Sequence, residues 1–66
     1  MTTGERVKNF RESKGISQEK LARELNFSLS LIAQIERNKI KPSRNFIQRV
    51  KKLYPEIDTN IFFSEK

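Results

Sequence analysis

Residues 17–37 read SQEKLARELNFSLSLIAQIER. Apolar residues recur in this stretch at spacings of three and four, which predicts helices and not strands. Ser17 and Ser28 are suited to N-capping and precede the first and the second apolar stripe. The stripes consist of Leu21, Ala22 and Leu25 in the first helix and of Ile32 and Ile35 in the second. We therefore predict two short helices joined by roughly three residues around Asn26.

The segment around Asn26 fits a tight turn between the two predicted helices. Asparagine is one of the few residues other than glycine that tolerate a left-handed backbone conformation. Ala22 supplies a small side chain where the helices would cross. In a helix-turn-helix with this spacing, the second helix enters the major groove of DNA. Turns of this length also join helices in other small helical proteins, so the spacing alone leaves both interpretations open.

The residues before this stretch predict one more helix, from about Thr3 to Lys14. Thr2 and Glu5 have the spacing of a capping box, and Gly15 is placed to end the helix. Its inward stripe comprises Val7, Phe10, Arg11 and Lys14.

The residues after the stretch predict two further helices. Asn38 is a second left-handed stop, and a loop then leads to Ser43, which caps a fourth helix that ends before Pro55. The inward face of that helix comprises Phe46, Ile47, Val50, Leu53 and Tyr54. Asp58 caps a last short helix that contains Ile61, Phe62 and Phe63. The pattern therefore predicts an all-α fold of five short helices in a single domain over residues 1–66.

The composition excludes several classes of protein. The chain of 66 residues contains no cysteine and no histidine, which excludes disulfides, thiolate metal sites and the usual general base. We expect no catalytic residue, no metal and no cofactor, and hence no enzyme. No apolar run resembles a signal peptide or approaches a membrane span, so a cytoplasmic protein without a membrane partner is expected.

The positive charge is concentrated in one segment. The net charge is +6, from 14 basic and 8 acidic residues. Residues 37–52 contain no acidic residue and hold half of the basic ones, namely Arg37, Lys39, Lys41, Arg44, Arg49, Lys51 and Lys52. This distribution predicts an anionic partner. A solvated basic face without a partner is the alternative.

The sequence resembles a known family over most of its length. Residues 11–22, RESKGISQEKLA, resemble the opening of phage repressor and Cro (Xre-type) helix-turn-helix domains, and residues 27–38, FSLSLIAQIERN, resemble the family's recognition helix and its end. Residues 42–54 are similar to its fourth helix. The spacing that carries the resemblance is that of Gln18, Leu21, Ala22, Ile32, Ile35 and Glu36. The resemblance implies a compact lambda-repressor-like domain that binds double-stranded DNA.

The chain departs from the family pattern at four positions. Asn26 and Asn38 stand where the family usually has glycine, and asparagine can adopt the same backbone region at some cost. Leu29 and Leu31 are more apolar than is usual on a recognition helix. These two leucines leave open how the predicted helix reads bases.

Helical spacing groups four residues on the outward face of the predicted recognition helix, and the resemblance places base contacts at the same positions. They are Leu29, Ser30, Ala33 and Gln34. An amide such as that of Gln34 can bond an adenine edge at two points, and Leu29 and Ala33 can touch a thymine methyl group. A solvated glutamine, and a leucine that packs on Leu25 or on a partner chain, are the alternatives.

The resemblance also implies a set of phosphate contacts. Gln18 matches the family's backbone-binding glutamine, and the loop after the recognition helix is expected to lie along the phosphates. The predicted phosphate-binding residues are Gln18, Ser28, Asn38, Lys39, Lys41, Ser43 and Arg44. Arg49, Lys51 and Lys52 are expected to contribute a general positive field.

Arg11 and Glu36 lie on inward-facing stripes of different helices. Opposite charges in such places are costly unless they pair. The matching residues of the family form a pair, so we predict a partly buried Arg11–Glu36 ion pair. Two charges at stripe edges in water are the alternative.

These observations predict a sequence-specific transcriptional regulator, a repressor, that binds a two-fold-related operator as a homodimer. The predicted dimer contact, in segment 57–63, comprises Ile57, Ile61, Phe62 and Phe63. An antitoxin-like protein-interaction module on the same scaffold is the alternative, and its apolar features would be this segment with Leu29 and Leu31. Non-specific, charge-driven binding of nucleic acid is a third interpretation.

Overall fold

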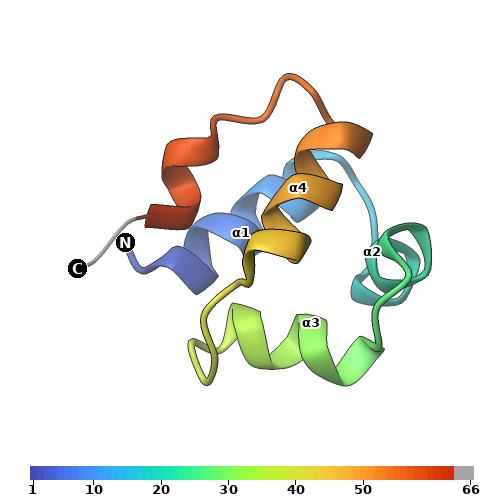
Figure 1. The fold of residues 1–66 in the computed structure, drawn as a ribbon. Helices are drawn as coiled ribbons and strands as arrows, with labels where there is room; N and C mark the ends of the chain where they lie inside the picture. The colour runs from blue at the N-terminus through green and yellow to red at the C-terminus, as the bar shows by residue number, and fades with distance from the viewer. Residues whose placement is uncertain (64–66) are drawn as a thin grey trace.

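The computed structural model describes residues 1–63 as a set of short helices packed around one core (Figure 1). The α-helices are α1 (Thr3–Ser13), α2 (Gln18–Leu25), α3 (Leu29–Glu36) and α4 (Arg44–Leu53). The fifth predicted helix, over Thr59–Phe63, is a 3-10 helix, η1, and not an α-helix. The predicted all-α class is confirmed, but the count of five helices is not, because residues 1–63 form four α-helices and one 3-10 helix. The short segment is consistent with the poorer hydrogen-bond geometry that keeps 3-10 helices brief.

Each α-helix begins at a residue whose hydroxyl accepts a backbone hydrogen bond. Ser17, Ser28 and Ser43 cap α2, α3 and α4, as predicted. At α1 the capping box is complete: Thr2 Oγ1 accepts from the amide of Glu5 at 3.2 Å, and Glu5 Oε1 accepts from the amide of Thr2 at 3.0 Å. Such caps satisfy amide groups that have no partner within the helix. The helix starts are therefore encoded locally.

Left-handed residues follow three of the helices. The φ angle is 61° at Asn26, 62° at Asn38 and 71° at Gly15. These are the three positions at which the sequence predicted helix ends. Asn26 lets the chain reverse between α2 and α3, so the two helices of the motif pack against each other.

The core is built from the predicted apolar stripes. Phe46 is fully buried at its centre, and its ring lies 5.7 Å from the ring of Phe27 and 6.1 Å from that of Phe62. The other buried hydrophobic residues are Val7, Leu21, Ala22, Leu25, Ile32, Ile35, Val50, Ile57 and Phe62. Ile57 and Phe62 were not predicted as core residues but as part of a dimer contact. Leu53 was predicted to face inward but is 40% exposed, and it is the last residue of α4.

The C-terminal segment closes the core against α1 and α4. Asp58 Oδ1 accepts a hydrogen bond from the amide of Asn60, which fixes the start of η1. Figure 1 shows η1 near the N-terminus, with α3 along the opposite edge of the molecule. Over residues 1–63, no helix is long and apolar enough to cross a membrane.

Candidate nucleic-acid interface

Helix α3 carries the four residues predicted to read bases. Leu29, Ser30 and Gln34 are exposed and Ala33 is half-buried, whereas the opposite stripe of Ile32 and Ile35 lies in the core. The helix is therefore held by one face while the other faces solvent. This division is the one that major-groove reading by a helix requires.

The two leucines of α3 have different surroundings. Leu31 is half-buried and packs against the core, while Leu29 is 43% exposed at the first turn. Leu31 therefore belongs to the body of the domain. Leu29 is the apolar residue that α3 presents to solvent.

Ser30 and Gln34 are joined by a hydrogen bond. Gln34 Nε2 donates to Ser30 Oγ at 3.0 Å, across one helical turn. Within residues 1–63, the second amide hydrogen and the carbonyl oxygen of Gln34 have no other recorded partner. These two groups match the acceptor and the donor that adenine presents in the major groove.

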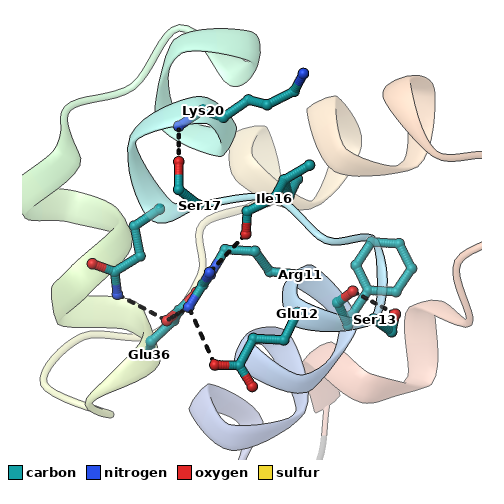
Figure 2. Close-up of polar contacts among 9 residues, drawn as sticks. Arg11, Glu12, Ser13, Ile16, Ser17, Lys20 and Glu36 are labelled. Atoms are coloured by element: carbon teal, nitrogen blue, oxygen red, sulfur yellow. Dashed lines mark hydrogen bonds and ion pairs between the residues drawn. The ribbon is translucent and has the colours of Figure 1, made fainter.

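The end of α3 is fixed by a buried ion pair (Figure 2). Arg11 donates to Glu36 Oε2 from Nε at 2.7 Å and to Oε1 from Nη2 at 3.1 Å, and both residues are buried. Its Nη1 also donates to the carbonyl oxygen of Ile16 at 2.8 Å. The hydrogen bond to Glu36 raises the pKa of Arg11 above its ordinary value, against the opposing effect of burial. The ion pair is present as predicted and joins α1 to α3.

Gln18 extends this network. Its Nε2 donates to Glu36 Oε1 at 2.9 Å, so the side chain predicted to bind phosphate is also bound to the end of α3. A second amide hydrogen remains for another acceptor. Gln18 stands in the first turn of α2, where free backbone amides point outward. The predicted phosphate contact at Gln18 stays a prediction, now with a partner that orients the side chain.

Asn38 has a role that the sequence did not indicate. Its Oδ1 accepts from the amide of Gly4 at 2.9 Å, and its Nδ2 donates to Thr2 Oγ1 at 2.7 Å. Both ends of the side-chain amide are therefore engaged with the N-terminus of α1. The predicted contact of Asn38 with phosphate would have to be made while these bonds hold the amide.

Three of the predicted phosphate-binding cations are exposed and unpaired. Among residues 1–63, Lys39, Lys41 and Arg44 have no recorded ion-pair or hydrogen-bond partner for their charged groups. The hydroxyls of Ser28 and Ser43 accept from the amides of Leu31 and Phe46, each at 3.1 Å. A serine hydroxyl that accepts in this way keeps its own hydrogen for a phosphate oxygen.

Two other cations of the basic segment hold the fold together. Arg49 Nη1 donates to the carbonyl oxygen of Leu25 at 2.9 Å, and its guanidinium lies 4.7 Å from the centre of the Phe27 ring. A cation at the end of α2 is favoured by the helix dipole. Lys51 Nζ donates to the carbonyl oxygens of Pro55 and Ile57. Within residues 1–63, the cations of the basic segment without an ion-pair or hydrogen-bond partner are therefore Lys39, Lys41 and Arg44, with Arg37 and Lys52 at its two ends.

Sequence reasoning missed the contribution of the N-terminal residues. A Cβ atom at Gly4 would lie 2.5 Å from the carbonyl oxygen of Ile35 and 2.6 Å from that of Glu36. The backbone of α1 therefore approaches the end of α3 more closely than a residue with a side chain allows. The signal in the sequence was glycine in the first turn of a helix, where it is usually unfavourable.

The residues predicted to make a dimer contact separate into two groups. Ile57 and Phe62 are 4% and 6% exposed in the core of the chain itself, so they are not available to a partner in this fold. Ile61 is half-buried, and Phe63 is 63% exposed. The predicted contact therefore narrows to Ile61 and Phe63. Phe63 lines a groove of about 440 Å³ together with Ile40, Pro42, Ile47 and the start of α1.

No cluster of acidic side chains suited to a metal ion occurs in the part of the chain that the structure describes. The arrangement instead offers a projecting helix face beside unpaired cations. Its charges and amide groups suit contacts with an anion and with base edges.

Comparison with known proteins places this geometry in a family. A family model described as a helix-turn-helix domain matches residues 4–59. The chain belongs to the helix-turn-helix domain family. It is also 38% identical over 50 residues to an immunity repressor protein of Bacillus phage phi105, which supports the predicted phage-repressor (Xre-like) type. That alignment covers 76% of the chain and 35% of the relative, so this helix-turn-helix domain spans about a third of the relative's length. No solved structure matches the chain significantly.

Proposed function

We propose that this helix-turn-helix domain is the sequence-specific DNA-binding part of a transcriptional regulator, and that it represses. Its α3 enters the major groove, with Leu29, Ser30, Ala33 and Gln34 toward the bases. The loop after α3 and the start of α4 then follow the phosphates.

One observation carries this proposal. Helix α3, with its outward face exposed, is followed in the chain by Lys39, Lys41 and Arg44. The charged groups of these three residues have no ion-pair or hydrogen-bond partner within residues 1–63. Unpaired cations beside a projecting helix supply both halves of DNA recognition: phosphate contacts that position the protein and base contacts that specify the sequence. The similarity to a phage immunity repressor supports the same function.

The proposed binding unit is a symmetric dimer on two half-sites about one helical turn of DNA apart. Phe63 and Ile40 are exposed apolar side chains that line one groove. A second copy of the chain would remove both from water. The alternative of a protein-interaction module loses one of its supporting features, because Leu31 packs into the core.

Selection of bound sites from a pool of random duplexes tests the proposed function. The expected result is a two-fold-related motif whose half-sites contain the bases read by α3. Recovery of no motif, with equal affinity for all duplexes, would contradict it. The chain would then bind DNA through charge alone.

Light scattering at increasing protein concentration tests the dimer separately. Phe63→Ser should shift the chain toward the monomer. Leu53→Ser is the control, since Leu53 is an exposed apolar residue, at 40% against 63% for Phe63, that lies outside the groove. Equal association of the wild type and both variants would contradict the proposed contact.

A further inference from the structure

The N-terminus of α1 and the loop after α3 are tied together at Asn38. Two hydrogen bonds join the side-chain amide of Asn38 to Gly4, at 2.9 Å, and to Thr2, at 2.7 Å. Both partners lie more than 30 positions earlier in the chain, at separations of 34 and 36. The absence of a side chain at Gly4 allows this close approach, since a Cβ there would lie 2.8 Å from Asn38 Oδ1. The contact is thus specific in both geometry and composition.

The tie lies at the point where α3 gives way to the basic loop. Asn38 has φ 62°, a conformation that glycine adopts without the cost borne by asparagine. The side chain therefore contributes something beyond the turn itself. Lys39 and Lys41, which follow Asn38, are exposed and have no side-chain partner within residues 1–63. Apart from the backbone bonds of Asn38 and Lys39 to the end of α3, the two bonds of the Asn38 side chain are the hydrogen bonds that hold residues 38–42 in this part of the chain.

We propose that Asn38 is a positioning residue for DNA binding, which holds the loop of residues 38–42 against the N-terminus of α1 and so aligns Lys39 and Lys41 with the phosphates. The proposal rests on the proposed function. It makes phosphate contact depend on Thr2 and Gly4, although neither lies in the helix-turn-helix. The chemistry that Asn38 serves is binding of phosphate by neighbouring ammonium groups, and its own amide acts within the protein.

Direct contact between Asn38 and a phosphate is the competing explanation. The geometry favours positioning, because Oδ1 accepts from Gly4 and one Nδ2 hydrogen is donated to Thr2, which leaves only the second Nδ2 hydrogen for a phosphate. The two explanations differ in what a change at Thr2 should do. Positioning requires an effect of Thr2 on DNA binding, and direct contact does not.

The test is the dependence of the DNA association constant on salt concentration. The probes are the duplex recovered by selection with the wild-type chain and a scrambled duplex of the same length. The slope of log K against log salt counts the phosphates neutralised. Asn38→Gly keeps the turn and removes both bonds. It should reduce the steepness of the slope by about one to two on either duplex, because two lysines would no longer be aligned with phosphates.

Variants at Thr2 and Glu5 separate positioning from a general loosening of α1. Thr2→Val should make the slope less steep, as Asn38→Gly does, whereas Thr2→Ser, which keeps the hydroxyl, should have the wild-type slope. The double variant of Thr2→Val and Asn38→Gly should show no greater change in slope than either single variant. Glu5→Ala weakens the same capping box without touching Asn38, so the slope should keep its wild-type value. Thermal melting of each variant shows that folded protein is being compared.

Two results would overturn the inference. One is an unchanged slope in Asn38→Gly. The other is a loss in Asn38→Gly that Thr2→Val does not reproduce, which would assign Asn38 to direct phosphate contact. If selection yields no motif, the proposed function fails, while the slopes on the scrambled duplex still test the alignment of the lysines.

Discussion

Arg11 and Glu36 form a two-point ion pair, with hydrogen bonds of 2.7 and 3.1 Å, between helices whose paired residues are 25 positions apart. Their side chains are only 10% and 3% exposed. Breaking such a buried pair leaves a charge without a partner in a place that water barely reaches. The pair therefore sets the position of the end of α3 relative to the body of the domain.

Glu36→Ala should lower the free energy of unfolding by about 3 kcal/mol, because it removes both hydrogen bonds of the buried Arg11 guanidinium to a carboxylate and leaves it only the exposed Glu12 at 3.9 Å. Urea unfolding measures the change. Glu12→Ala is the matched control: Glu12 is 3.9 Å from the same arginine but its side chain is 55% exposed, so the loss should be below about 1 kcal/mol. Equal stability of Glu36→Ala and the wild type would contradict the role of the pair.

Gly4→Ala should destabilise the fold by about 1–3 kcal/mol, because the new methyl group would overlap two backbone carbonyl oxygens of α3. Gly15→Ala offers a comparison, since nothing lies within 4 Å of a Cβ there and only the positive φ opposes the change. We expect a cost of about 1 kcal/mol at Gly15. Thermal unfolding of both variants checks the difference, and a fully stable Gly4→Ala would show that α1 does not approach α3 so closely.

The single tyrosine, Tyr54, gives a test by titration. Burial, and then its hydrogen bond to Glu24 at 3.0 Å, raise the pKa of Tyr54 above 10.0. Because folding favours the protonated form, the stability linked to this group is present below pH 10 and is lost as the pH rises through the higher folded value. The midpoint of the titration followed by phenolate absorbance should therefore lie above pH 10.

Glu24→Gln should move that titration toward 10.0 without reaching it, since burial of the ring remains. A midpoint at or below 10.0 in the folded wild type would contradict the packing of Tyr54 against α1 and α2.

Leu29 should read a thymine methyl group, because it is the exposed apolar residue of α3. Replacing thymine by deoxyuridine at successive positions of the selected site removes only that methyl group. At one position, the wild type should bind deoxyuridine about fourfold more weakly than thymine, as expected when the burial of one methyl group is lost. Leu29→Ala should bind the two duplexes equally, while Leu53→Ala, altered on α4, should behave as the wild type. Equal discrimination by Leu29→Ala and the wild type would exclude this contact.

Much of the fold could be predicted from the sequence because its signals are local. A serine or threonine before an apolar stripe is enough to begin each α-helix, and Asn26 and Asn38 mark the left-handed ends at their observed positions. The ion pair was also predictable, since Arg11 and Glu36 lie on stripes that must face the core.

The remaining features depend on how separate elements meet. Helical spacing placed Leu29 on the outward face, as observed, but it did not show that Leu31 packs against the core. Nor does it reveal that Asn38 bonds Thr2 and Gly4, since these contacts join distant parts of the chain. The surroundings of Leu53 and Phe62 also differ from those predicted, because η1 folds back and packs Phe62 against Phe46, whereas Leu53 at the end of α4 is 40% exposed.

The most direct test of the central claim, that α3 reads DNA sequence, is the ratio of affinities for the selected duplex and for its scrambled counterpart, measured at several salt concentrations. Gln34→Ala should lower this ratio by about tenfold or more and leave affinity for scrambled DNA unchanged, because one base contact is lost and no phosphate contact. Gln48→Ala, altered at an exposed glutamine of α4, should keep the wild-type ratio. A ratio that Gln34→Ala leaves intact, or equal loss of affinity on both duplexes, would contradict reading by α3.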